Sequence, residues 1–283
     1  MEFLACQRTE GKAFMLDIRE DLLTDKLIHI EDTKIRQVKH DWLHSDYTGD
    51  ATLTNVTEKA AEWLLSSKRN SVYGIENFPK LDVIYGCTDY IDNFLMKEKK
   101  YQIIKNDYSY YKLLGKAENS VGELEENVPV IVSLPNWYHG NNRPDWKDFL
   151  KECETKNINI HLDAAWYTAS NGMQLDVSHP NIKTVGFSLT KTGFQWNKFG
   201  IRFSRQKTID SITVRNASGW VNLNTINCAN FVMDNIHIDH AWDTHEDHYK
   251  QICHELDLEQ ADFIHVAKKN GKPIGVANIL NRI

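Results

Sequence analysis

Two short segments, IHLDAAW at 160–166 and KTVGFSLTK at 183–191, decide the fold of this chain. Each contains an apolar run of strand length, and the first run ends on the acid Asp163 while the second leads into the amine Lys191. In parallel α/β sheets, ligands bind beyond the carboxyl ends of the strands. We therefore expect Asp163 and Lys191 to lie near the same edge of a sheet.

The rest of the first two hundred residues alternates in the same way. Helical spacing follows or precedes each apolar run, which predicts a mostly parallel α/β sheet with helices on both faces. The expected strands are 81–86, 101–105, 128–134, 157–163, 183–190 and 198–204, and the expected helices are 55–67, 88–99 and 143–156, with Pro144 in the first turn of the last.

The pattern changes after about residue 205. Helices are expected at 224–236 and 245–258, and two strands are expected to form a hairpin that turns at Asn270-Gly271. We therefore divide the chain into an N-terminal segment (1–50), a large α/β domain (51–205) and a small α+β C-terminal domain (206–283).

Composition excludes several classes of protein. A net charge of −6 over 283 residues argues against a general nucleic-acid or membrane-surface binder, which needs a basic face. The five cysteines are odd in number and form no CxxC pair, as is typical of a reducing compartment. Neither a secretory signal nor an apolar run of membrane-helix length is evident, so we expect a cytoplasmic protein.

A turn at Gly86-Cys87-Thr88 opens a helix directly after a strand. Helix N-termini offer free N–H groups and suit a phosphate, although an ordinary N-cap by Thr88 fits the motif equally well. Taken singly, Asp163 could be a helix cap and Lys191 a surface amine. Their order and strand-end context together favour a site, because an acid and an amine are what pyridoxal phosphate requires of a protein.

At this point the chain resembles the fold-type-I pyridoxal-phosphate enzymes, the aspartate aminotransferase superfamily. The resemblance covers roughly residues 55–205 and rests on an ordered set of short motifs. VIYGCTDYIDNFL is similar to the family's phosphate turn, IIKNDYSYY to its aromatic segment, SLPNWYHG to its Asn-Pro loop, LDAAW to its Asp-x-Ala-Tyr and SLTKTG to its Ser-x-x-Lys.

The resemblance implies a role for each matching residue. Lys191 would bind the cofactor as an imine and transfer protons, and Asp163 would pair with the pyridine nitrogen. Tyr108 would stack on the ring, and Lys198 would replace the family's phosphate-binding Arg, with Arg202 as the alternative. The full set of expected cofactor-binding residues is Gly86, Cys87, Thr88, Tyr108, Asn136, Asp163, Ala165, Ser188, Lys191 and Lys198.

The chain departs from the family pattern in three places. Asn136 fills the Asn position only with a shift of one residue, since strict register puts Trp137 there. Trp166 stands where the family has a Tyr hydroxyl, for which the neighbouring Tyr167 could substitute. The substrate carboxylate has no recognisable arginine; Arg215 and Arg282 are candidates.

The function expected from the resemblance is an aminotransferase acting on an amino acid or other primary amine, as a homodimer with sites at the interface. Other pyridoxal-phosphate chemistry (lyase, racemase, decarboxylase) and a non-catalytic derivative are alternatives. A metal enzyme is the alternative of a different class, because histidines and acids are dense between His237 and His254. That cluster matches no known ligand pattern, so a polar solvated helix is favoured and no metal site is expected.

Overall fold

The computed structural model describes residues 18–24, 29–45, 52–114, 118–136 and 138–282. Its centre is a seven-stranded sheet in which, among the described strands, β9 alone runs against the others. The strand order is β2 (Lys80–Ile84), β9 (Gly200–Ser204), β8 (Ile182–Ser188), β6 (Ile160–Asp163), β5 (Val130–Ser133), β3 (Gln102–Ile104) and β4 (Glu118–Asn119). The predicted mostly parallel sheet is confirmed.

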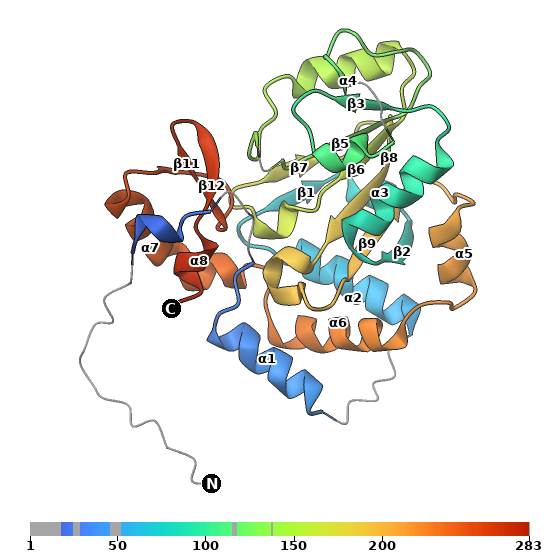
Figure 1. Ribbon diagram of the computed structural model, residues 1–283. Coiled ribbons are helices and arrows are strands. Elements are labelled where there is room, and N and C mark those ends of the chain that lie inside the picture. Colours follow the sequence, from blue (N-terminus) through green and yellow to red (C-terminus); the bar gives the residue numbers. More distant parts are fainter. Residues whose placement is uncertain (1–17, 25–28, 46–51, 115–117, 137, 283) are drawn as a thin grey trace, which may run out of the picture.

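Helices cover both faces of this sheet (Figure 1). Because alternate side chains of a strand point to opposite faces, Val130 and Val132 join one apolar cluster while Ile131 joins the other. The first face carries α2 (Leu53–Leu65), α4 (Trp146–Thr155) and α6 (Leu223–Asn235), and the second carries α3 (Gly86–Lys97) and α5 (Ser211–Ala217). Burial on both faces explains the continuous apolar runs.

The contact of α3 with β8 positions the end of the helix that bears Thr88. A Cβ atom added at Gly186 would lie 2.7 Å from the Tyr90 ring, so the helix packs directly on the strand backbone. The Tyr90 hydroxyl lies 2.7 Å from Thr184 Oγ1, which is in turn 2.8 Å from Nδ1 of His161. This buried chain of hydrogen bonds ties α3 to β8 and β6.

The remaining elements lie around the sheet. Near the N-terminus are η1 (Glu20–Leu22) and α1 (Thr33–Leu43), and β1 (Ser71–Tyr73) pairs in parallel with β7 (Gln174–Asp176). Short turns are η2 (Ile75–Asn77), η3 (Ser109–Lys112), η4 (Tyr167–Ala169) and the π-helical η5 (Thr190–Phe194). The C-terminal elements are α7 (His240–Glu255), β10 (Glu259–Gln260), β11 (Val266–Lys269), β12 (Lys272–Gly275) and α8 (Ala277–Leu280).

The C-terminal hairpin is confirmed, since β11 and β12 are antiparallel and turn at Asn270 and Gly271, both with positive φ. α7, α8 and the hairpin surround an apolar cluster of their own, whereas α6 packs in the main core with α2. The domain boundaries remain predictions. One expectation is wrong: α4 begins at Trp146 after an N-cap at Asp145, so Pro144 precedes the helix. None of the described helices is long and apolar enough to cross a membrane.

We predict that Gly186→Ala lowers the free energy of unfolding by about 1–3 kcal/mol, because the added methyl group overpacks the contact with Tyr90. Chemical denaturation of both forms measures this difference. In a Tyr90→Leu background the same substitution should cost much less, since the ring it meets is gone. An equal cost in both backgrounds would show that the α3–β8 contact does not depend on this glycine.

Candidate active site

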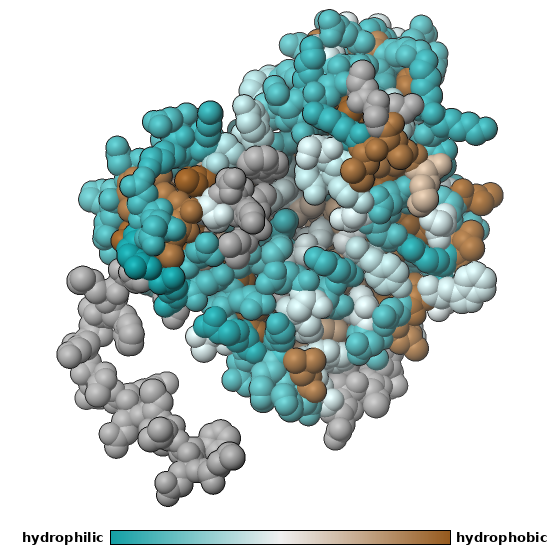
Figure 2. All heavy atoms as spheres, in the orientation of Figure 1, coloured by the Kyte–Doolittle hydropathy of each residue, from teal (hydrophilic) through white to brown (hydrophobic). Residues whose placement is uncertain are grey.

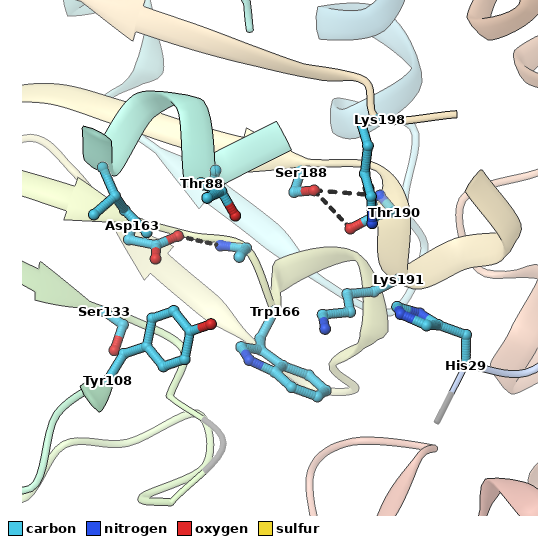
Figure 3. A pocket seen from close by; sticks show the side chains of 13 residues that line it. His29, Thr88, Tyr108, Ser133, Asp163, Trp166, Ser188, Thr190, Lys191 and Lys198 are labelled. Atoms are coloured by element: carbon cyan, nitrogen blue, oxygen red, sulfur yellow. Dashed lines mark hydrogen bonds between the residues drawn. The ribbon is translucent and has the colours of Figure 1, made fainter. Parts of the chain in front are cut away.

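A cavity of about 190 Å³ opens where the carboxyl ends of three parallel strands meet the N-terminus of α3 (Figure 3). Asp163 ends β6, Ser188 ends β8, Ser133 ends β5, and Thr88 lies in the first turn of α3. The residues around the cavity are His29, Cys87, Thr88, Ile91, Tyr108, Ser133, Asp163, Ala165, Trp166, Ser188, Thr190, Lys191 and Lys198. Eight of the ten expected cofactor-binding residues therefore line one cavity, as the strand-end argument requires.

Asp163 is a buried acid whose oxygens are held in place. Oδ1 accepts a hydrogen bond from the Ala165 backbone N–H at 2.9 Å, and Oδ2 accepts one from the Tyr111 hydroxyl at 2.9 Å. Burial raises the pKa of Asp163, and these hydrogen bonds oppose part of that rise. A carboxylate kept dry in this way pairs strongly with a cationic group that enters the cavity.

Lys191 lies on η5, directly beyond the end of β8. Its Nζ is 4.3 Å from the centre of the Trp166 ring, a cation–π distance. Burial, and then the positive charge of Lys198, lower the pKa of Lys191 to about 8. A lysine with such a pKa is a neutral amine for an appreciable part of the time near pH 7, and this form can attack a carbonyl carbon.

Hydroxyl groups and a cation surround the N-terminus of α3. Ser188 Oγ lies 2.8 Å from Thr190 Oγ1 and accepts from the Thr190 N–H at 3.3 Å, and Thr88 and Lys198 line the same part of the cavity (Figure 3). The free N–H groups of the first helical turn add a partial positive charge. We call these four residues the anion cup, because their donors and charge fit a phosphate.

Gly86 does not line the cavity. It takes a left-handed φ of 72°, which turns the chain from β2 into α3 and brings Cys87 and Thr88 to the cavity wall. A Cβ atom there would lie 3.6 Å from Ser188 Oγ, so the glycine also keeps the backbone close to the anion cup.

A second buried acid, Asp107, organises the wall that carries Tyr108 and Ser133. It accepts hydrogen bonds from the Tyr108 N–H at 2.7 Å and from the Ser133 hydroxyl and N–H. The Arg143 guanidinium reaches it at 3.1 Å, and both side chains of this ion pair are almost completely buried. Tyr108 and Ser133 are thereby fixed to one carboxylate.

Asn136 belongs to this network and does not line the cavity. Its amide donates to Ser133 Oγ at 2.8 Å and to Asp107 Oδ1 at 3.2 Å, and its carbonyl oxygen accepts from the Tyr138 N–H. These bonds shape the loop after β5 and connect Asn136 to the cavity through Ser133 and through Asp107, which also holds Tyr108. Trp137, the residue in strict register, lies outside the described residues.

Tyr167 does not substitute for the missing Tyr hydroxyl at position 166. It is fully buried in the main core, 5.3 Å from the Phe187 ring, while Trp166 lines the cavity. Arg202, the alternative to Lys198, pairs with Asp82 and Asp210 away from the cavity. Arg215 pairs with Asp89 at 2.6 Å, and Arg282 follows α8; neither lines the cavity.

Two histidines of the cluster between His237 and His254 connect two helices through one carboxylate. His240 and His245 lie 2.8 and 3.1 Å from one oxygen of Asp32, whose other oxygen caps α1 by accepting from Ile35 N–H. This joins α7 to α1. Among the described residues, no group of three or more His, Cys, Asp and Glu side chains is placed to hold a metal ion.

Four polar or aromatic lining residues were not expected as binding residues: His29, Ser133, Trp166 and Thr190. Ser133 ends β5, and Thr190 begins η5 two residues after the end of β8. Both lie inside motifs already considered, so position alone could have pointed to them. His29 comes from the N-terminal segment, where the sequence pattern carries no signal of a site.

The chain matches no protein-family model, and no curated protein sequence matches it. Solved structures do match its fold. A tyrosine aminotransferase from Leishmania infantum has a TM-score of 0.57 at 11% identity, covering 91% of this chain and 90% of that one. A pyridoxal-phosphate-bound C-S lyase from Staphylococcus hominis has a TM-score of 0.59 at 12% identity, covering 89% of this chain and 76% of that one. A histidinol-phosphate aminotransferase from Clostridium acetobutylicum has a TM-score of 0.52 at 18% identity, covering 82% of this chain and 75% of that one. The chain therefore has the fold of the fold-type-I enzymes.

We predict that Asp107→Ala lowers the free energy of unfolding by about 3–5 kcal/mol, because it leaves the buried Arg143 guanidinium without its buried partner. The matched control is Asp145→Ala, which removes the partly exposed second partner of Arg143 and should cost about 1 kcal/mol or less. Urea denaturation measures both values. Similar costs for the two variants would contradict the role given to Asp107.

Proposed function

We propose that this protein is a pyridoxal-phosphate-dependent enzyme that acts on an amino acid or other primary amine. One observation carries the proposal: a buried acid, an amine of lowered pKa and an anion cup open on a single cavity at the strand ends. None of these three features is distinctive alone, but their combination meets each chemical demand of this cofactor.

The residues of the cavity fit the cofactor part by part. The anion cup would hold the phosphate, Asp163 would pair with the protonated ring nitrogen, and Tyr108 would lie against the ring. Lys191 would bind the aldehyde carbon through its amine. When bound, pyridoxal phosphate supplies an electron-withdrawing ring that stabilises negative charge on the substrate carbon.

The protein's own groups handle the proton. Lys191 lines the cavity, so its free amine would be able to take a proton from the substrate carbon and deliver it to another atom. Its pKa of about 8 suits both proton transfers near neutral pH. In its protonated form the ammonium rests over the Trp166 ring. Asp163 lies at the opposite end of the cavity, where its carboxylate form would favour a cationic ring nitrogen.

We further propose transamination as the reaction. The solved structures that share the fold include both aminotransferases and a lyase, so the fold supports the cofactor class more strongly than the reaction. Lyase, racemase or decarboxylase chemistry would use the same Asp163 and Lys191. Appearance of a keto acid from an amino acid would support transamination. A homodimer with sites at its interface stays a prediction.

The absorbance spectrum tests the cofactor proposal. Protein incubated with pyridoxal phosphate and desalted should show a band near the visible edge that disappears on borohydride reduction. Lys191→Ala should lose the band. Lys183→Ala should keep it, because Lys183 lies on β8, before Lys191, and its amine donates a hydrogen bond to the Pro180 carbonyl at the surface. A desalted protein without the band, or a band that survives in Lys191→Ala, would contradict the proposal.

A second prediction concerns the pKa of Lys191 in the protein without cofactor. Raising the pH deprotonates the amine, so its labelling by acetic anhydride, followed by mass spectrometry of its peptide, should increase with a midpoint at about pH 8. Lys198→Gln removes a neighbouring positive charge that lowers this pKa, so the midpoint should move to higher pH. The exposed Lys207→Gln should leave it unchanged. An unshifted midpoint in Lys198→Gln would contradict the electrostatic account.

A further inference from the structure

Tyr111 lies behind Asp163 and, unlike that acid, does not line the cavity. It is fully buried in η3, in the apolar cluster that also contains Ile103 and Ile131. Its hydroxyl nevertheless donates a hydrogen bond of 2.9 Å to Oδ2 of Asp163, which is itself only 3% exposed. A phenylalanine would fill the same space in the core, so packing alone does not account for the hydroxyl. Its one buried task is the contact with the carboxylate.

The Tyr111 hydroxyl keeps its proton and therefore remains a donor. Burial, and then the negative charges of Asp163 and Asp107, raise the pKa of Tyr111 well above its ordinary value. A hydrogen bond donated to a carboxylate stabilises the charged form of the acid. The donor to the other oxygen is the backbone N–H of Ala165, which every residue except proline supplies. The contribution of Tyr111, in contrast, depends on the identity of its side chain.

The turn that carries Tyr111 is held by the buried ion pair of Arg143 and Asp107. Asp107 accepts from the Tyr108 N–H at 2.7 Å, and the Tyr111 N–H donates to the Tyr108 carbonyl at 3.1 Å. The Tyr111 ring stands nearly perpendicular to that of Tyr108, with their centres 5.6 Å apart. Tyr111 is thus a fixed link between the acid at the end of β6 and the aromatic ring in the cavity wall.

The charge of Asp163 is set by groups on several elements. The titratable side chains that interact with it are Cys87 and Tyr90 on α3, Asp107, Tyr108 and Tyr111 in and around η3, and Lys191 on η5. Burial raises the pKa of Asp163 and the negative charge of Asp107 adds to the rise, whereas the hydrogen bond from Tyr111 opposes it. The carboxylate form of this acid therefore depends on its donors.

We propose that Tyr111 is a positioning residue of the site, which keeps Asp163 ionised and aimed at the cavity by donating its hydroxyl hydrogen to Oδ2. The purpose of this arrangement rests on the proposed function, since a carboxylate is what a protonated ring nitrogen requires. The hydrogen bond itself exists without the cofactor. Because Tyr111 does not line the cavity, it would act only through Asp163.

The pH titration of the Asp163 carboxyl carbon, followed by carbon NMR in cofactor-free protein, tests this role. Asp163→Asn assigns the signal. In Tyr111→Phe the midpoint should rise by about 1–2 pH units, because the carboxylate loses a donor. The matched control is Tyr110→Phe, which removes the neighbouring hydroxyl that donates to the half-buried Asp92 at 2.9 Å, and it should leave the midpoint unchanged.

A second variant covers the case in which Tyr111→Phe does not fold. Tyr111→3-fluorotyrosine keeps the hydroxyl and makes it a stronger donor, because fluorine withdraws electrons from the phenol. The Asp163 midpoint should then move to lower pH, opposite to the shift in Tyr111→Phe. A residue that only filled space in the core would give no such pair of opposite shifts.

The outcomes separate the positioning role from the cofactor. The expected shifts in a protein that takes up no pyridoxal phosphate would support the role of Tyr111 while contradicting the proposed function. Uptake of pyridoxal phosphate together with an unshifted Asp163 midpoint in the Tyr111 variants would overturn the inference. An equal shift in Tyr110→Phe would overturn it as well, because the effect would then not belong to the Tyr111 hydroxyl.

Discussion

The close approach of α3 to β8 at Gly186 is the constraint on which the candidate site depends. Any side chain at this position would push the Tyr90 ring away, and with it the helix. With hydrogen there, Cys87 reaches the Gly186 carbonyl at 3.3 Å and the first helical turn lies next to Ser188. Because Asp163 is the register partner of Gly186, one strand position fixes both the anion cup and the acid.

The cavity is polarised along its length. Asp163 occupies one end, and Lys191, Lys198 and His29 lie toward the other (Figure 3). Burial moves the pKa of the acid upward and that of the amine downward, so both groups become more able to exchange protons near neutral pH.

Figure 2 shows a largely polar surface on the face that it presents, with apolar side chains gathered in limited areas.

The sequence predicted those parts of the site that are local to strand ends. Asp163, Ser188 and the turn at Gly86 follow apolar runs, and parallel strands bring such positions to one edge whatever their exact order. It did not predict that β9 runs antiparallel to its neighbours, because an apolar run does not show in which direction the strand will run in the sheet. It also missed β1 and β7, whose three-residue strands are too short for periodicity to show. His29 escaped notice for another reason: it reaches the cavity from the N-terminal segment by long-range packing, which no local pattern records. For Asn136, the motif match said nothing about the hydrogen bonds to Ser133 and Asp107 that hold its side chain in the loop.

The central claim is that Lys191 is the residue that bonds to pyridoxal phosphate in this cavity. Borohydride reduction of the protein with bound cofactor, followed by proteolysis and mass spectrometry, tests it directly, because reduction makes the bond permanent. We expect the mass of one phosphopyridoxyl group on the peptide that contains Lys191, in a one-to-one ratio with the chain. Modification of Lys198 in its place, or of scattered surface lysines at low yield, would contradict the account.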